Sequence, residues 1–305
     1  MTSSYPFICK ICGRESFETE LLCDSEDYCV CKDDFGCKKE KNDKENFKKI
    51  YNDLLINGNE CNPRAKKTLE IENFSFVFPP YTRFVSFSSR NLNLNYIKRE
   101  FLWYLKGDRF DLSILKYAKM WETFVNEDGS IQSNYGQYIF NKKLDQFDNV
   151  VNILYDDPDS RRATIMILQP YHLIEKWKEI PCTLSLSFRI RKNKLNMTVK
   201  MRSQDAYLGF ASDIPIFSFI HEMLFVVLRS KYTNLSIGSY YHFVDSFHIY
   251  ENHFDFLNNI AKDSYKLIDC PKISSKEEVY FFINNLDAET IPSSYKFSKW
   301  LTTFN

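Results

Sequence analysis

The chain has 305 residues, which is enough for one large domain or for one domain with an appendage. Its 40 basic and 40 acidic residues give a formal net charge of zero, so the charge does not indicate a polyanionic partner, and we expect no direct binding to nucleic acid. No apolar run reaches the length of a membrane span, and the N-terminus does not read as a signal peptide. We therefore expect a soluble cytoplasmic protein, in the host cytoplasm if the gene is viral.

The first 44 residues contain six of the nine cysteines and no histidine. The start Cys9-x-x-Cys12-Gly resembles a zinc knuckle, whose turn brings two thiolates to one tetrahedral ion. A four-cysteine structural zinc site is the simplest model, and a disulfide-bonded or free-thiol segment is the alternative. Cys9 and Cys12 would form one half of the site. The assignment of the other half is open, because it needs two of four candidates: Cys23, Cys29, Cys31 and Cys37.

A lysine-rich linker at 38–49 passes into a helix that ends at Gly58. The apolar residues of this helix are expected to share one buried face: Phe47, Ile50, Tyr51, Leu54 and Leu55. After a basic loop that contains Arg64, residues 68–78 alternate apolar and polar, which predicts a strand. A second helix is predicted over 98–108 (KREFLWYLKGD). From the residues alone its Glu100 is a surface charge, although bulky apolar neighbours would raise the pKa of a buried carboxyl.

Two adjacent arginines, Arg161 and Arg162, follow a turn of sequence DPDS. Paired guanidinium groups can clamp a phosphate dianion, although a charged surface turn has the same signature. The following residues 163–170 (ATIMILQP) predict a buried strand.

The stretch from Pro181 to Asp213 begins with a hairpin, because residues 184–190 and 195–201 alternate apolar and polar around a charged RKNK turn. A hairpin brings its two ends together, so Cys182 and Arg202 should be close in space. A cation beside a thiol favours the nucleophilic thiolate, whereas the alternative is a buried structural cysteine beside a surface arginine. A strongly apolar helix follows Asp213. His248 and Tyr250, two apart on an extended segment, should point to the same side.

Several motifs together resemble the thymidylate synthase family, which includes the phage deoxycytidylate hydroxymethylases. They are the PC dipeptide with its hairpin and RSxDxxLGxxxDI, the helix similar to ELLWFLxGD, the DPDSRR turn, and the HIYENH segment. The resemblance covers roughly residues 45–260, and the C-terminal tail loses the pattern. It implies an α+β, three-layer fold with a mixed β-sheet. We therefore predict two domains, a zinc-binding module at 1–44 and a catalytic domain at 45–305.

The resemblance also implies roles for individual residues. Cys182 would be the nucleophile, Glu100 the general acid/base group and Tyr135 the group that assists removal of the C5 proton. Asp213 would face the pyrimidine base, and His248 and Tyr250 would bind a sugar hydroxyl. Two sets of further residues would contact the ligands. The phosphate set is Arg202, Ser203 and Arg64, with Arg161 and Arg162 donated across a homodimer interface; the folate set is Trp121, Asp205, Gly209 and Arg90.

The base is suggested by Asp213, because thymidylate synthases carry asparagine there. A carboxylate accepts a hydrogen bond from N4 of cytosine, whereas it would oppose O4 of uracil, at a cost on the order of 1–3 kcal/mol. Thr183 also departs from the family, which usually has histidine there, and Ser246 replaces an aspartate. We therefore predict a deoxycytidylate 5-hydroxymethyltransferase that uses 5,10-methylenetetrahydrofolate and water. The alternatives are a dCMP methyltransferase, a dUMP enzyme, and an inactive relative that binds a nucleotide or a partner.

Overall fold

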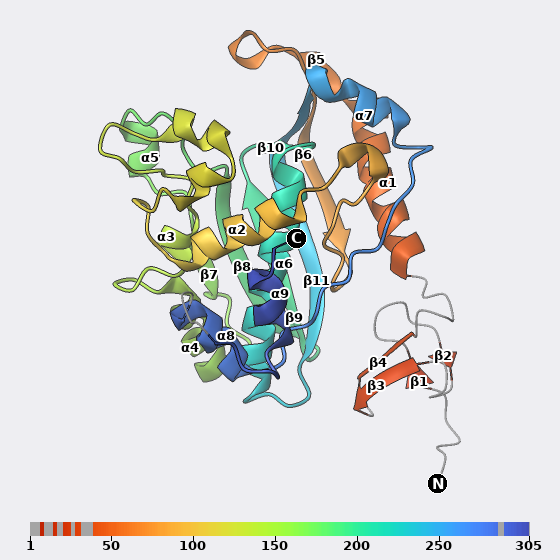
Figure 1. Ribbon diagram of the computed structural model, residues 1–305, viewed down its shortest axis with the longest axis vertical. Coiled ribbons are helices and arrows are strands. Elements are labelled where there is room, and N and C mark those ends of the chain that lie inside the picture. Colours follow the sequence, from red (N-terminus) through yellow and green to blue (C-terminus); the bar gives the residue numbers. More distant parts are fainter. Residues whose placement is uncertain are drawn as a thin grey trace.

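The computed structural model describes the backbone of residues 7–8, 15–16, 21–25, 28–31, 39–285 and 290–304, and side chains from residue 43 onward within these ranges. The fold is built around a seven-stranded mixed sheet with helices packed against it (Figure 1). The mixed sheet and the α+β class are as predicted from the sequence. Within the described residues the helices are α1 Lys39–Asn57, α2 Leu94–Leu105, α3 Gly136–Ile139, α4 Gln146–Asp156, α5 Tyr171–Ile174, α6 Gly209–Arg229, α7 Phe254–Asn259, α8 Lys276–Asn284 and α9 Lys296–Thr302.

The sheet has the order β5-β6-β11-β9-β8-β7, and a short strand β10 pairs with β11. The pairs β6–β11, β8–β9, β7–β8 and β5–β6 are antiparallel, whereas β11 runs parallel to β9 and to β10. The strands span β5 Asn59–Cys61, β6 Thr68–Phe78, β7 Thr164–Met166, β8 Thr183–Arg191, β9 Lys194–Met201, β10 Gln204–Asp205 and β11 Ser236–Tyr250. The predictions of β6 and of the β8–β9 hairpin are confirmed.

The two long strands, β6 and β11, do not bury the same face along their whole length. Near the middle of each strand, the side chains that pack into the core switch from one face to the other. On β11 the core side chains are even-numbered from Tyr240 to Val244 and odd-numbered at Phe247 and Ile249. Opposite this change, Asn73 of β6 has a left-handed φ of 54°, a conformation that asparagine tolerates better than most residues. Beyond this point the even-numbered residues of β11 lie on the face opposite the helical core.

Helix α6 forms the centre of the core, as its apolar sequence predicts. Figure 1 shows it lying against the sheet together with α2 and α9. It is long and apolar enough to cross a membrane on those criteria alone, but 94% of its most apolar window is buried inside the protein. We therefore interpret α6 as a core helix.

Four predicted elements differ from the structure. Helix α2 spans Leu94–Leu105 rather than 98–108, and α6 begins at Gly209, so that Asp213 lies inside it rather than before it. Helix α1 begins at Lys39, inside the predicted linker, and it buries Phe47, Ile50, Tyr51 and Leu54, but Leu55 is 41% exposed. Adjacent helical positions differ by about 100°, which turns Leu55 off the buried face. Strand β7 is short and lies at the edge of the sheet, so Ile165 is buried and Met166 is exposed, rather than the whole strand being buried.

The predicted zinc ligands lie outside the residues whose side chains the structure describes. The backbone there forms two antiparallel pairs, β1 Phe7–Ile8 with β2 Glu15–Ser16 and β3 Leu21–Ser25 with β4 Tyr28–Cys31. Cys23 and Cys29 are Cα partners in the second pair. Among the described side chains no group of three or more His, Cys, Asp or Glu is arranged to hold a metal ion.

Candidate active site

The β8–β9 hairpin holds Cys182 and Arg202 at its open end. Its turn residues Lys192 and Asn193 both have positive φ, 52° and 55°, which suits a tight turn between twisted strands. The ladder closes with the Arg202 N–H donating to the Cys182 carbonyl at 2.9 Å. The guanidinium Nη2 of Arg202 lies 3.6 Å from Sγ of Cys182 and donates to the Ile180 carbonyl at 3.0 Å. The predicted proximity of cysteine and arginine is confirmed.

The ionisation of the Cys182 thiol differs from the expectation. Burial raises its pKa to about 11, and Arg202 lowers it only in part, because the negative charges of Glu179 and Asp213 raise it further. Arg202 therefore lowers the pKa of the thiol, as expected, but not far enough to produce a thiolate near neutral pH. Nucleophilic use of this thiol requires removal of its proton.

Two carboxyl groups from different helices share this site. Glu100 on α2 is 5% exposed, which excludes the alternative of a surface charge. Burial and then the charge of Asp213 raise the pKa of Glu100 to about 8, and its Oε2 atom has no hydrogen-bond partner among the described residues. Asp213, in the first turns of α6, accepts a hydrogen bond from Gln204 Nε2 at 3.1 Å, and burial raises its pKa to about 7. Both groups can hold a proton near neutral pH.

Glu179 is a third carboxyl group beside the thiol, and the sequence analysis missed it. It lies three residues before Cys182, on the segment that Arg202 holds through the Ile180 and Pro181 carbonyls. Burial raises its pKa to about 7, whereas Arg202 and a hydrogen bond from the backbone N–H of Ser133 lower it. Its Oε2 atom is buried without a partner among the described residues. The only sequence signal was a carboxylate three positions before the cysteine.

Tyr135 and Trp121 are both buried beside these groups. Gly136 lets Tyr135 approach α2, because a Cβ at this position would lie 1.7 Å from the Tyr104 carbonyl oxygen. Burial and then the charge of Cys182 raise the pKa of Tyr135. Trp121 donates from Nε1 to the Tyr96 hydroxyl at 3.0 Å, and that hydroxyl in turn hydrogen-bonds Glu100. Tyr96, which the sequence analysis did not single out, therefore links Trp121 to the carboxyl.

Two residues assigned to folate by resemblance carry buried polar atoms without partners among the described residues. Asp205 accepts from the backbone N–H groups of Tyr207 and Leu208 through Oδ1, and its Oδ2 is unpaired. Arg90 stacks its guanidinium 4.4 Å above the Tyr207 ring, and its Nε is unpaired. A Cβ on Gly209 would lie 3.4 Å from Oδ2 of Asp213, so this glycine borders the site. These atoms offer an acceptor and a donor to a bound group.

The predicted sugar and phosphate residues divide into two sets. Tyr250 lies next to His248, with ring centroids 5.3 Å apart, and the charges of Asp205, Arg64 and Cys182 act on its hydroxyl. Ser203 directly follows Arg202. The structure therefore brings these residues to the thiol's end of the sheet.

Arg161 and Arg162 are exposed and lie elsewhere in the protein. The carbonyl of the next residue, Ala163, pairs with the N–H of Phe188, six residues along β8 from Cys182. Six strand residues span about 20 Å. These arginines are thus too far along the sheet to contact a phosphate held beside the thiol of the same chain.

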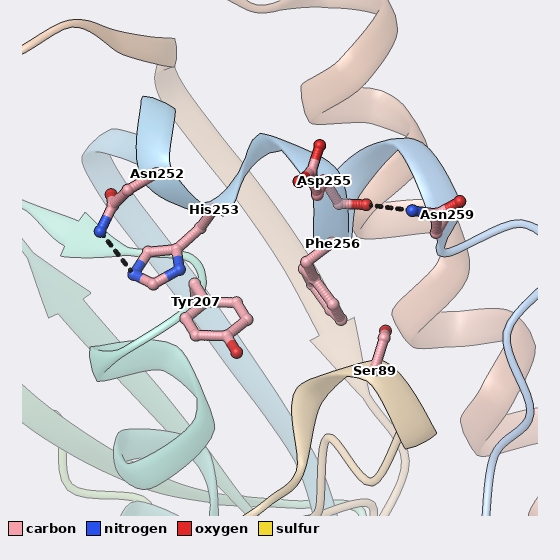
Figure 2. A pocket seen from close by; sticks show the side chains of 7 residues that line it. All are labelled: Ser89, Tyr207, Asn252, His253, Asp255, Phe256 and Asn259. Carbon is pink, nitrogen blue, oxygen red and sulfur yellow. Dashed lines mark hydrogen bonds between the residues drawn. The ribbon is translucent and has the colours of Figure 1, made fainter.

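A small pocket of about 240 Å³ is lined in part by Tyr207 (Figure 2). The Tyr207 ring stacks on His253 at 3.9 Å between centroids, and Asn252 approaches the same imidazole at 3.3 Å. The lining includes neither Cys182 nor Glu100. It consists of Ser89, Tyr207, Asn252, His253, Asp255, Phe256 and Asn259.

Comparison with known proteins defines the class to which this fold and site belong. The family model for thymidylate synthase matches residues 45–292, so the chain belongs to the thymidylate synthase family, whose members are one-carbon transferases. The resemblance seen in the sequence is confirmed, and the match extends past the predicted end near residue 260 into the C-terminal tail.

The similar proteins include enzymes with different substrates. The chain is 30% identical over 235 residues to the deoxyuridylate hydroxymethyltransferase of Bacillus phage SP01, covering 72% of this chain but only 59% of that enzyme. It is 28% identical over 237 residues to the thymidylate synthase of Clostridium beijerinckii, covering 76% and 87%. It is 31% identical over 196 residues to the deoxycytidylate 5-hydroxymethyltransferase of Enterobacteria phage T4, covering 62% and 78%.

Proposed function

We propose that this protein transfers a hydroxymethyl group to C5 of deoxycytidylate. The observation that carries the choice of base is Asp213, a carboxyl group beside the thiol. One of its oxygens can accept a hydrogen bond from N4 of cytosine, and a proton held near neutral pH can be shared with N3. The similarity to the phage T4 enzyme supports the same reading.

The proposed chemistry begins with the Cys182 thiolate. Its sulfur adds to C6 of the pyrimidine, and the electron pair of the C5–C6 double bond makes C5 a nucleophile. Tyr135 assists the later loss of the C5 proton, and at the end the Cys182 thiolate leaves C6 as the C5–C6 double bond re-forms. Glu100, buried with one free oxygen, positions the water whose oxygen becomes the new hydroxyl.

Folate would be held by residues whose partnerless atoms fit its polar groups. Asp205 Oδ2 offers an acceptor and Arg90 Nε a donor, with Trp121 and Gly209 lining the adjoining space. When bound, 5,10-methylenetetrahydrofolate supplies the one-carbon unit.

We further propose an isologous homodimer. On the sheet face away from α6, Val77 and Tyr241 are directly paired and exposed, and Phe243 beside them is 46% exposed. An exposed apolar sheet face of this kind is typical of an interaction surface. Arg161 and Arg162, too distant from their own thiol, would reach the phosphate in the partner's site.

A second candidate is the corresponding reaction on deoxyuridylate. When Asp213 is protonated, its hydroxyl can donate to O4 of uracil and its other oxygen can accept from N3–H, so the raised pKa makes this pairing accessible. The similarity to the phage SP01 enzyme favours it as well.

The decisive experiment is tritium release from C5-labelled dCMP and dUMP, with and without methylenetetrahydrofolate, followed by mass spectrometry of the product. Folate-dependent release from dCMP with a hydroxymethyl mass supports the proposal, and a methyl mass would make it a methyltransferase. Release only from dUMP supports the second candidate. Absence of release from both favours an inactive relative that binds a nucleotide or a partner.

We also propose that the N-terminal segment binds structural zinc. The support is the sequence alone, in the Cys9-x-x-Cys12 spacing and the cluster of six cysteines. Metal analysis of the purified protein should find about one zinc per chain, lost in Cys9→Ser/Cys12→Ser and kept in the control Cys61→Ser.

A further inference from the structure

A hydrogen-bonded chain on the sheet leads from Glu70 to His248. The Ser246 hydroxyl donates to Oε1 of Glu70, and Ser246 Oγ lies 3.3 Å from Nδ1 of His248. Glu70 is the Cα partner of His248 across the antiparallel β6–β11 pair, and Ser246 lies two residues earlier on β11. All three side chains therefore lie on the same face, where Tyr250 also lies.

The direction of these hydrogen bonds fixes the position of a proton on the imidazole. Ser246 has one hydroxyl proton, and Glu70 takes it, so Ser246 Oγ can only accept from Nδ1. The second neighbour of Nδ1 is the Ser246 carbonyl oxygen at 3.4 Å, which is also only an acceptor. Nδ1 therefore carries the hydrogen, and in the neutral ring Nε2 is left as an acceptor.

Glu70 is itself held from its other side. The Cys61 thiol donates to Oε2 of Glu70 at 3.4 Å and lies 2.9 Å from the Thr68 hydroxyl. Both carboxylate oxygens are thus engaged, which fixes the group that orients Ser246. The neighbouring Glu72 is on the same strand and face but is exposed, and it has no such contact with Ser246 or His248.

We propose that Glu70 is a positioning residue for the nucleotide sugar, acting through Ser246 to keep His248 in the Nδ1–H tautomer. This inference rests on the proposed function, in which His248 and Tyr250 meet the sugar. In a deoxynucleoside 5′-monophosphate the 3′-hydroxyl is the only free sugar hydroxyl. An unprotonated Nε2 accepts a hydrogen bond from that hydroxyl. The hydrogen bonds from Glu70 through Ser246 to His248 therefore favour a substrate that carries a hydrogen-bond donor at the 3′ position.

The kinetic test compares dCMP, or dUMP if that is the base used, with its 2′,3′-dideoxy analogue by tritium release. Glu70→Ala is expected to reduce the wild-type preference for the 3′-hydroxyl about 5- to 10-fold, the range of one hydrogen bond. The loss should lie in KM for the hydroxyl-bearing substrate, with kcat unchanged. Ser246→Ala should do the same, and Glu72→Ala should not. In Glu70→Ala/Ser246→Asp, a carboxylate beside Nδ1 should restore the preference.

A spectroscopic test needs no activity. Long-range ¹H–¹⁵N spectra should show His248, assigned by loss of its signals in His248→Gln, as the Nδ1–H tautomer in wild type and as the Nε2–H tautomer or a mixture in Glu70→Ala. An unchanged tautomer, an unchanged preference for the 3′-hydroxyl, or an equal loss in Glu72→Ala overturns the proposal. Failure of the proposed function can be told apart from failure of this inference. In the first case the wild type would turn over neither dCMP nor dUMP, but the tautomer of His248 would still show whether Glu70 controls it.

Discussion

The Nη2 atom of Arg202 lies 3.6 Å from Sγ of Cys182, yet the thiol keeps its proton because burial raises its pKa to about 11. The charges of Glu179 and Asp213 oppose the effect of Arg202. The reactivity of the cysteine is therefore controlled by a balance of nearby charges in a poorly solvated place.

Glu179→Gln is expected to make Cys182 more reactive. It removes a negative charge that raises the pKa of the thiol, so the midpoint of alkylation by iodoacetamide against pH should fall by up to about one pH unit. Peptide mass spectrometry follows Cys182 separately from the other cysteines. Glu175→Gln changes an exposed residue on the same segment and should leave the midpoint for Cys182 unchanged. The alkylation of Cys270, another free cysteine, should be the same in both variants as in the wild type. A midpoint in Glu179→Gln that stays or rises would contradict this balance.

Glu100→Gln should become more stable than the wild type as the pH rises. The pKa of Glu100 is about 8 in the folded protein against an ordinary value of 4.5, so between these values the folded state keeps a proton that the unfolded state has lost. The free energy of unfolding therefore falls with rising pH in this window, by up to about 1.4 kcal/mol per pH unit for this group. Denaturation by urea at pH 5, 6, 7 and 8 should show the two proteins diverging. Exposed Glu72→Gln should run parallel to the wild type, and parallel curves for Glu100→Gln would mean that Glu100 is not held protonated.

Asp213→Asn is expected to shift base preference toward uracil. An amide can donate to O4 and accept from N3–H, whereas it cannot supply the proton that the acid shares with N3 of cytosine. The ratio of kcat/KM for dCMP to that for dUMP should fall at least about 10-fold, within the range expected for unpaired polar groups. Gln204→Met keeps the carboxyl and removes its hydrogen-bond donor, so it should retain the wild-type order of bases. A ratio unmoved by Asp213→Asn would remove Asp213 from base recognition.

The C-terminal tail is anchored by a buried ion pair that contacts it at Ile273, inside the residues that the family model matches. Arg83 and Glu222 are 3% and 1% exposed, and the other Glu222 oxygen accepts from the Ile273 N–H at 3.1 Å. Glu222→Ala leaves a buried cation unpaired, so it should cost about 3–5 kcal/mol of unfolding free energy. Arg83→Met/Glu222→Leu should cost less, and exposed Glu277→Ala should cost little. A double variant less stable than Glu222→Ala would mean that the charges themselves hold the tail.

The parts of the fold that sequence predicts best are those with local causes. The β8–β9 hairpin follows from alternation on both sides of a polar turn, and the buried face of α1 follows from helical spacing except at Leu55. The change of buried face at Asn73 is marked within β6 by two consecutive polar residues, Glu72 and Asn73, but only the pairing with β11 shows that both strands change face at the same point. Contacts between residues that strand pairing brings together cannot be predicted from the sequence of either strand alone.

The candidate site shows the same division. The motifs placed Cys182, Arg202 and Asp213 in one region, because they lie on a single hairpin and the helix after it. Glu70 and Ser246 are 176 positions apart, and only the register of β6 against β11 joins them. The ionisation of Cys182 was also inaccessible, because the direction of its pKa depends on burial that no motif records.

The distance between the paired arginines and the thiol gives a test of the proposed dimer. A Cys182→Ala chain and an Arg161→Ala/Arg162→Ala chain should each be nearly inactive alone, since each lacks one part of every site. When the two chains are mixed, unfolded and refolded together, they can form heterodimers. One of the two sites in each heterodimer then has both the cysteine and the paired arginines. Random pairing would restore about a quarter of wild-type activity per dimer in a two-fold symmetric assembly. Arg191→Ala, which changes an exposed arginine near the same turn, should be active by itself. Arginines that serve their own chain would give no recovery, and the cross-subunit assignment would then be wrong.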